Sequence, residues 1–307
     1  MKNTIIAVIV LLVLAVGGFF LWKSMQNSNM TVNNPTPISV TTPAPTPAPA
    51  TTTTAIAPTN KMETVLGNSV EGRKVTAYHF GTGSKELLFV AGAHGGYEWN
   101  TTLVAYQLMD YLKANPTSIP SGLRVTVIPT LNPDGLFKVT GKDGRFVPTD
   151  VSTSKEVVVS GRYNGNNVDL NRNFDCDWKA TGIWQSTKVS GGSAPFSEPE
   201  SKALKTYITA HKPTAVVEWF SSAGGVYSSH CGGTVSAETA AITNVYADAS
   251  GYPAYKEFNS YEITGDSVNW LAKNNIPAIS VLLTNHTDTE WAKNKAGIDA
   301  LLAHYAK

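Results

Sequence analysis

The chain has 307 residues, a formal net charge of +1 and a pI of about 7.7, and 42% of its residues are hydrophobic. This length suits one large domain or two modest ones. A nearly neutral chain with no basic run between aromatic residues gives no reason to expect a nucleic-acid partner. Its cysteines, Cys176 and Cys231, are not spaced as a Cys-x-x-Cys pair, which favours a disulfide over a metal site.

The N-terminus begins with an apolar segment. Residues 1–4 form a short tail, and residues 5–22 form an uncharged, mostly apolar run closed by Lys23. At ~1.5 Å of rise per residue such a helix is roughly 27 Å long, close to the ~30 Å hydrocarbon thickness of a bilayer. We expect a single-pass transmembrane anchor here. A cleaved signal peptide is the alternative, although the run is longer than usual and no typical cleavage site precedes Lys23.

Residues 23–61 are predicted to form a disordered stalk. Within them, residues 33–60 are dominated by Thr, Pro and Ala, which bury too little apolar surface to offset the entropy of ordering. A stalk of this composition suits the outside of a membrane. We therefore expect residues 62–307 to be an extracytoplasmic domain held at the cell membrane by the N-terminal helix.

Residues 62–307 alternate between strand-like and helix-like segments. Apolar runs predict strands, helical spacing of apolar residues predicts helices, and Ser197–Glu200 has the pattern of a capping box with proline in the first turn. The strands are expected over 86–91, 124–130, 214–219 and 277–283, and the helices over 100–112, 197–211, 237–249, 266–274 and 288–305. A turn is expected over 132–135. This alternation predicts an α/β sheet covered by helices, with binding groups in loops at strand ends.

His94 follows the first of these strands, and Glu98 lies four residues later. Gly95 and Gly96 allow a sharp turn, so that the Glu98 carboxylate can point back toward the imidazole. An imidazole and a carboxylate that converge at a strand end are natural ligands for a zinc ion. Alone, the pattern is weak evidence for a metal site and is more typical of a loop histidine that is hydrogen-bonded to a glutamate at a helix start.

Further motifs follow in a characteristic order. After His94 and Glu98 come an Asn-Pro-Asp-Gly segment at 132–135, Arg162, an Asp-Leu-Asn-Arg-Asn segment at 169–173 and a Phe-Ser-Glu-Pro-Glu segment at 196–200. This series resembles the zinc carboxypeptidase family and covers roughly residues 65–306. The resemblance implies a mixed, twisted sheet with helices on both faces. The family spaces its His and Glu one residue more closely, and a bulge at the two glycines would absorb the difference.

The resemblance also implies roles for four polar residues. Asn171 and Arg172 would hold the terminal carboxylate of a peptide, for which a planar guanidinium is well suited. Arg162 would polarise the scissile carbonyl and stabilise the oxyanion, and Tyr261 would close over the bound C-terminal residue. Peptide or cell-wall stem-peptide C-termini are the partners this implies. Without a binding role, Arg172 would be a structural arginine in a salt bridge. Tyr261 would then be a half-buried aromatic residue of a loop.

Two positions depart from the family pattern. The family places its third zinc ligand, a histidine, where this chain has Phe220, and its general base, a glutamate, where this chain has Leu282. Neither side chain can perform those tasks, so we expect zinc binding to be weak or absent. Glu218, on the same strand face as Phe220, and His230, on the following loop, are the candidate replacement ligands.

Three functions remain open from the sequence. The domain could bind peptide carboxylates without cutting them, it could be an active zinc carboxypeptidase with a replacement ligand, or it could be a scaffold without a binding site. In each case the loops that follow Asn173 and Phe220 should emerge at the same end of the sheet. We therefore predict a disulfide between Cys176 and Cys231.

Overall fold

The computed structural model describes residues 62–307. The predicted anchor over 5–22 and the predicted stalk over 23–61 lie outside the described residues. Within 62–307, no helix is both long and apolar enough to cross a bilayer.

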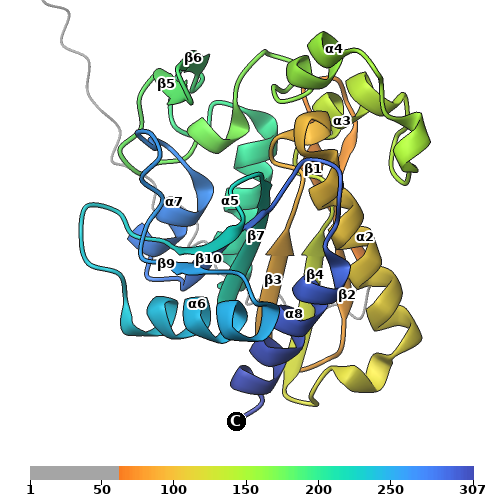
Figure 1. Cartoon of the computed structure of the whole chain (residues 1–307), viewed down its shortest axis with the longest axis vertical. Coiled ribbons are helices and arrows are strands. Elements are labelled where there is room, and N and C mark those ends of the chain that lie inside the picture. Colours follow the sequence, from red (N-terminus) through yellow and green to blue (C-terminus); the bar gives the residue numbers. More distant parts are fainter. Residues whose placement is uncertain (1–61) are drawn as a thin grey trace, which may run out of the picture. The chain divides into compact units, whose positions relative to one another are not determined.

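An eight-stranded mixed sheet runs through the domain (Figure 1). Its strands lie in the order β1 (Glu63–Asn68), β2 (Lys74–Phe80), β4 (Leu123–Ile128), β3 (Lys85–Val90), β7 (Ala215–Ser221), β10 (Ala278–Leu283), β8 (Gly225–Ser228) and β9 (Ala254–Tyr255). The central strands β4, β3, β7 and β10 are parallel, whereas β1, β2 and β8 pair antiparallel to their inner neighbours. The carboxyl ends of β3, β7 and β10 therefore meet at one edge of the sheet, which is where α/β proteins place their sites.

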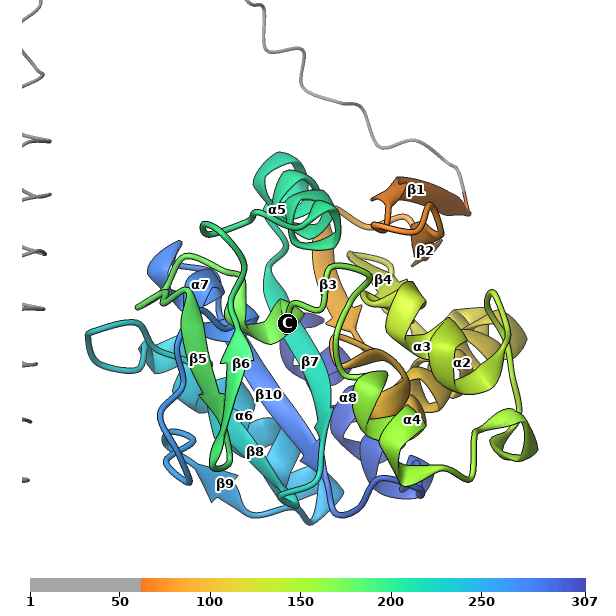
Figure 2. The same cartoon turned by 90° about the horizontal axis from the view of Figure 1, so that it is seen from above.

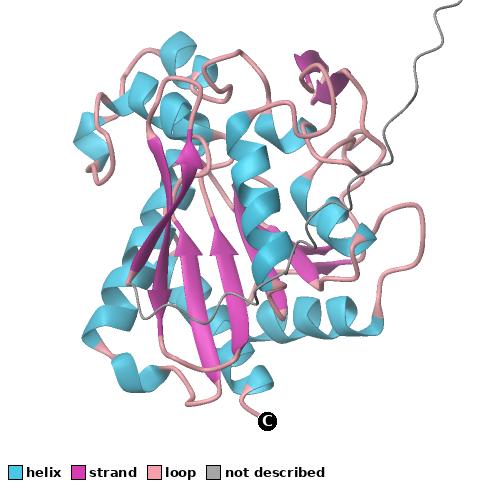
Figure 3. Ribbon diagram, turned by 180° about the vertical axis from the view of Figure 1, so that it is seen from behind, coloured by secondary structure: helices cyan, strands magenta, loops and turns pink. Residues whose placement is uncertain are grey.

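Helices pack on both faces of this sheet (Figures 2 and 3). One hydrophobic core joins alternate strand residues such as Phe89 to the helices α2 (Trp99–Ala114), α6 (Ala237–Ser250) and α8 (Trp291–Tyr305). The other core joins the intervening residues, such as Leu88, to α5 (Pro199–His211) and α7 (Ser267–Lys273). Side chains of a strand alternate between faces, so each central strand contributes to both cores.

The strands and helices predicted from apolar periodicity form, with ends within a few residues of those expected. Two local predictions are wrong. The segment 132–135 is not an isolated turn but the start of α3 (Pro133–Thr140), in which Asn132 Oδ1 caps the helix by accepting a 2.9 Å hydrogen bond from the Gly135 N–H. At α5, Glu198 is the N-cap residue without a side-chain cap, because the Ser197 hydroxyl donates to the Glu198 carboxylate instead.

The segment between α3 and α5 contains structure that its weak periodicity did not predict. It includes the short helix α4 (Lys155–Ser160) and a two-stranded hairpin of β5 (Thr181–Trp184) and β6 (Thr187–Ser190). The predicted Cys176–Cys231 disulfide is confirmed, with the two Cα atoms 5.9 Å apart. It ties the chain after Asn173 to the loop after β8. The expected reason for the bond is wrong, because β8 lies between Phe220 and Cys231 and runs antiparallel to β10, so the loop after β8 leaves the sheet at the end opposite to the carboxyl end of β7.

Candidate functional site

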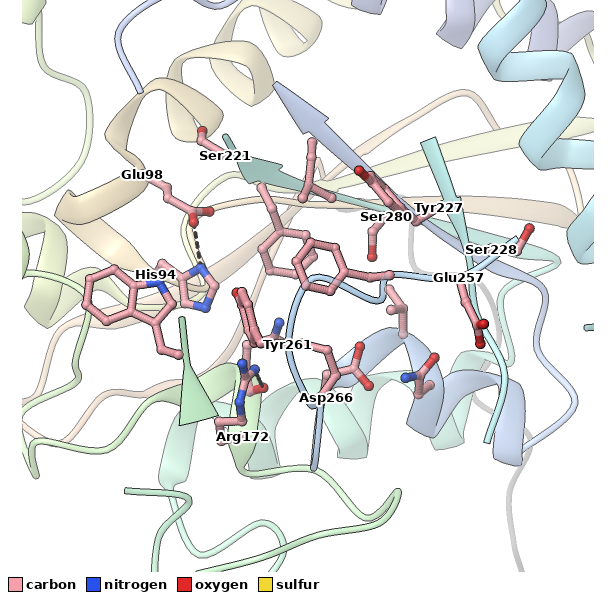
Figure 4. Close-up of a pocket in the computed structure, with 18 of the residues that line it drawn as sticks. His94, Glu98, Arg172, Ser221, Tyr227, Ser228, Glu257, Tyr261, Asp266 and Ser280 are labelled. Atoms are coloured by element: carbon pink, nitrogen blue, oxygen red, sulfur yellow. Dashed lines mark hydrogen bonds and ion pairs between the residues drawn. The ribbon is translucent and has the colours of Figure 1, made fainter. Parts of the chain in front are cut away.

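A pocket opens at the carboxyl ends of β7 and β10 (Figure 4). It brings together nine of the residues singled out from the sequence: His94, Glu98, Arg162, Asn171, Arg172, Phe220, His230, Tyr261 and Leu282. Glu218 is not among its lining residues. The sequence motifs, which are spread over nearly two hundred positions, therefore converge on one cavity.

His94 and Glu98 lie side by side on the wall of the pocket. His94 Nδ1 is 2.9 Å from Glu98 Oε1, and both side chains are buried. The glycines between them make this turn feasible: Gly95 has a φ of +46°, and a Cβ on Gly96 would lie 2.4 Å from the side chain of Val139. The bulge expected at the Gly-Gly pair is thus a turn of 3₁₀ helix packed tightly against α3.

Asp169 connects this pair to Arg162, a role that the sequence did not reveal. Asp169 Oδ1 is 3.4 Å from His94 Nε2, and Asp169 Oδ2 accepts a 2.9 Å hydrogen bond from Arg162 Nε and forms an ion pair with Arg162 Nη2 at 2.8 Å. Burial opposes ionisation of Asp169, but Arg162 and His94 outweigh burial and hold its pKa far below the ordinary value. Burial and the charge of Arg162 favour the neutral form of His94. The negative charges of Glu98 and Asp169 outweigh both effects, so the pKa of His94 is raised above its ordinary value.

Arg172 is buried in the pocket lining and is held by backbone carbonyls. Its Nε and Nη2 donate to the Ile183 carbonyl at 3.2 and 2.8 Å, and its Nη1 donates to the Asn171 carbonyl at 2.6 Å. The hairpin strand β5 therefore supports this side chain. Gly182 packs directly on it, since a Cβ there would lie 2.8 Å from Arg172 Cδ.

Aromatic rings enclose the two arginines. The Tyr261 ring centroid is 6.0 Å from the guanidinium carbon of Arg172, and the Trp184 ring centroid is 4.5 Å from that of Arg162. Tyr97 contacts Trp184 edge to face, with ring centroids 5.0 Å apart. Trp184 and Tyr97 were not identified from the sequence, because nothing local predicts that the β5–β6 hairpin folds back onto Arg162.

Phe220 and Leu282 form the apolar part of the pocket. They are direct neighbours in the parallel pairing of β7 with β10. They are only 5% and 8% exposed, and the Phe220 ring centroid lies 5.4 Å from that of His94. The Phe220 ring therefore occupies the space beside the imidazole where a further polar group would otherwise stand.

The two candidate replacement ligands are engaged elsewhere. Glu218 is fully buried and accepts a hydrogen bond from the Ser267 hydroxyl, and burial raises its pKa to about 8. His230 lies in the pocket wall, where its Nε2 is 3.1 Å from Glu257. Figure 4 shows Glu257 on the far side of the pocket from His94 and Glu98.

A zinc ion would meet an incomplete set of donors here. Both His94 nitrogens and Glu98 Oε2 are buried without a hydrogen-bond partner, so these two residues have atoms free for a cation. Among the His, Cys, Asp and Glu residues of 62–307, however, only Cys176, Asp177 and Cys231 bring three ligand atoms within 4.8 Å of one another. The two cysteine sulfurs of this group form the disulfide. Catalytic zinc sites use three protein ligands. The donors around His94 do not fit such a site.

Asp266 adds a carboxyl group to the lining of the pocket. Asp266 is 6% exposed, and its Oδ1 has no hydrogen-bond partner. Burial raises the pKa of Asp266 to about 6, even though Arg172 opposes this effect. The pocket lining therefore holds two guanidinium groups and, within the electrostatic reach of Arg172, a carboxyl group with an unpartnered oxygen.

The family model for zinc carboxypeptidases matches residues 53–297. This chain belongs to the zinc carboxypeptidase family. Among curated proteins, it is 27% identical over 224 residues to gamma-D-glutamyl-L-diamino acid endopeptidase 1 of Lysinibacillus sphaericus, covering 64% of this chain and 54% of that protein. It is 28% identical over 150 residues to carboxypeptidase B of Astacus astacus, covering 47% and 48%. The chain thus spans about half the length of these relatives.

Solved structures share the fold. The murein-tripeptide amidase MpaA of Escherichia coli O157 superposes with a TM-score of 0.56 at 20% identity, covering 80% of this chain and 92% of that one. Thrombin-activatable fibrinolysis inhibitor superposes with a TM-score of 0.63 at 16% identity, covering 80% and 71%. The mixed sheet with helices, predicted from the resemblance, is therefore that of the family.

Proposed function

We propose that this family member binds the C-terminal carboxylate of a peptide and is impaired in cutting it. One observation carries the proposal. Phe220 and Leu282 stand side by side at the ends of β7 and β10, within the same pocket as Asn171 and Arg172. The carboxylate-binding residues of the resemblance are therefore kept, while the positions of the third ligand and the base are apolar.

The two apolar residues remove different parts of the chemistry. Phenylalanine cannot coordinate a metal, so His94 and Glu98 would hold zinc weakly. Leucine cannot accept a proton from a water molecule, and the loss of a general base alone costs ~10²–10⁴-fold in rate. The two changes together favour a site that binds but does not cut.

The hydrogen bonds of Arg172 leave it able to hold a carboxylate. A guanidinium has five N–H groups, and the contacts with Asn171 and Ile183 engage Nε, Nη1 and Nη2 once each. One hydrogen on each terminal nitrogen remains, which is the pair that a carboxylate accepts bidentately. Its fixed, buried position means that little side-chain entropy is lost on binding.

Asp266 in the pocket lining favours a particular C-terminal residue. The unpartnered oxygen of Asp266 suits a ligand whose side chain ends in an ammonium group, such as lysine or another diamino acid. Two relatives are named for cell-wall chemistry, one as a diamino acid endopeptidase and one as a murein-tripeptide amidase. A peptide or cell-wall stem peptide that ends in a diamino acid is therefore the ligand class we propose.

We also propose that the domain acts outside the cytoplasm, tethered by residues 5–22 through the stalk over 23–61. The Cys176–Cys231 disulfide supports this, because disulfides persist mainly in oxidising compartments. Protease treatment of intact cells tests the tether. The domain should be released by cleavage in the stalk and should otherwise stay with the membrane fraction. Recovery of the intact chain from the cytoplasm would contradict it.

The binding function is tested by calorimetry with one peptide ending in lysine, prepared as the free acid and as the C-terminal amide. We expect the acid to bind at least tenfold more tightly, because charge-assisted hydrogen bonds contribute ~1.5–3 kcal/mol. Arg172→Ala should abolish this difference. Arg145→Ala is the matched control, since Arg145 pairs with Asp110 on the surface. Equal binding of acid and amide would refute the proposal.

The alternative is an active enzyme in which Glu218 or His230 completes the zinc site. Elemental mass spectrometry separates the two readings. Stoichiometric zinc that resists a mild chelator, and that Glu218→Ala or His230→Ala removes, would establish the alternative. Loss of zinc on dialysis would favour the binding function.

A further inference from the structure

Glu218 is a fully buried carboxyl group with no part in the pocket wall, and this position calls for an explanation. Burying such a group without full hydrogen bonding is costly. Its Oε2 meets the hydroxyl of Ser267, and its Oε1 has no partner. An apolar residue at this place in β7 would avoid the cost, so the group has a purpose other than core packing.

Ser267 links Glu218 to Asn171. The Ser267 N–H donates to Asn171 Oδ1 at 3.1 Å, and the Ser267 hydroxyl lies 3.2 Å from the same oxygen. All three residues are buried, with exposures of 0% for Glu218, 1% for Ser267 and 8% for Asn171. We call this chain of contacts the Glu218–Ser267–Asn171 relay.

The Ser267 N–H, held in place by the hydrogen bond from the Ser267 hydroxyl to Glu218, decides which atom of the Asn171 amide faces a ligand. An amide side chain can turn over with almost no change in shape, so its orientation depends on its hydrogen bonds. A backbone N–H can only donate, so the atom that faces Ser267 must be the oxygen. The Asn171 Nδ2 group is then left for the pocket, and it makes no hydrogen bond to any residue within 62–307. A donor in this position suits a carboxylate, whereas an oxygen there would repel it.

We infer that Glu218 is a positioning residue for carboxylate recognition: by fixing Ser267, it holds the Asn171 amide with its N–H groups toward the ligand. This inference rests on the proposed function. It also gives Glu218 a task that does not involve a metal ion. The buried carboxyl group orients Asn171, the residue that would contact the ligand.

The test uses the ratio of the affinities for the free-acid and amide forms of the lysine-terminated peptide. Glu218→Met keeps the shape but removes the hydrogen bond, and Ser267→Ala removes the hydroxyl. Each should lower the acid-to-amide ratio about fivefold, the effect of one hydrogen bond. The double variant should lower it no further, because both changes break the same chain of contacts. Affinity for the amide should not change.

Conservative variants and a control complete the design. Glu218→Gln and Ser267→Thr keep a hydrogen-bonding group, so they should keep the ratio. Glu200→Met is the matched control: Glu200 is also fully buried and hydrogen-bonded, 3.1 Å from Asn164, but lies outside the pocket. It should lower the melting temperature and leave the ratio unchanged, which separates positioning from general loss of packing.

The outcomes that overturn the inference are distinct from those that overturn the binding function. If the unmodified domain bound the free acid and the amide with equal affinity, both the proposed binding function and the relay would be refuted. A high wild-type ratio that survives both Glu218→Met and Ser267→Ala would leave the function standing and refute the relay. Effects of the two variants that multiply, or a Glu200→Met effect of equal size, would refute it as well.

Discussion

Introducing a histidine at position 220 and a glutamate at position 282 is the most demanding prediction, because under the proposed function it asks a binding pocket to become an enzyme. The change is Phe220→His together with Leu282→Glu. The new histidine would lie beside His94 and Glu98, and the new glutamate would be its direct neighbour on β10. We expect tight zinc binding and release of C-terminal residues from peptides in the double variant, and much less from either single change.

The burial of these residues sets the magnitudes. Leu282 is 8% exposed, so Leu282→Glu alone loses ~2 kcal/mol of hydrophobic burial and a further ~1–3 kcal/mol for an unpartnered carboxyl. For a domain of this size that total lowers the melting temperature by roughly 10 °C. In the double variant, zinc at a hundredfold excess over its Kd should restore about 3 kcal/mol.

Three measurements follow this prediction: melting temperature with and without zinc, zinc content by elemental mass spectrometry, and peptide products by liquid chromatography and mass spectrometry. The unmodified domain with excess zinc is the control. A double variant that holds stoichiometric zinc but releases nothing would show that Leu282 is not the base position. Equal zinc stabilisation of the unmodified domain would show that Phe220 does not replace a ligand.

Three further predictions concern the scaffold. Replacing Cys176 and Cys231 by alanine opens a loop of 55 residues and should lower the free energy of unfolding by about 4 kcal/mol in the chain-entropy model, measured by denaturant titration; a change below about 1 kcal/mol would count against the bond. Gly182→Ala should displace Arg172 and reduce affinity for the free-acid peptide severalfold while leaving the amide unaffected, as calorimetry would show. Burial raises the pKa of Glu290, but its hydrogen bonds outweigh burial and lower the pKa to about 2. The stability that ionised Glu290 adds to the fold is therefore present above the ordinary pKa of about 4.5 and is lost as the pH falls from there toward 2. Since this group is partly solvated, Glu290→Gln should cost only about 1–2 kcal/mol at pH 7, and a cost that does not shrink on acidification would contradict the assignment.

Local sequence predicted the four central strands and the major helices, but not the outer strands β1, β2, β8 and β9. The central strands and the major helices were predictable because one or two faces of each are buried, which leaves a periodic pattern of apolar residues. The β5–β6 hairpin was not, because it has few buried side chains and is held by contacts such as that between Ile183 and Arg172. The cap of α3 was mistaken for a turn because an Asn-Pro-Asp-Gly segment is typical of both.

Of the candidate site, only the residues that belong to recognisable sequence motifs could be predicted. The resemblance placed Arg162 and Arg172 in one pocket, but it did not reveal that Asp169 joins Arg162 to His94 across 75 positions of sequence. The bond between Glu218 and Ser267, 49 positions apart, was equally hidden. Such contacts depend on which loops meet at the end of the sheet, and no local pattern specifies that.

The central claim is that this pocket binds a peptide C-terminus without cutting it, and one experiment tests it directly. The unmodified domain is incubated with excess zinc and a lysine-terminated peptide at a concentration that saturates binding, and the peptide is followed by mass spectrometry. The account predicts that the peptide is bound and remains intact over hours. Release of the C-terminal lysine that Arg172→Ala abolishes and a chelator stops would contradict it, and would show that the chain is a working carboxypeptidase.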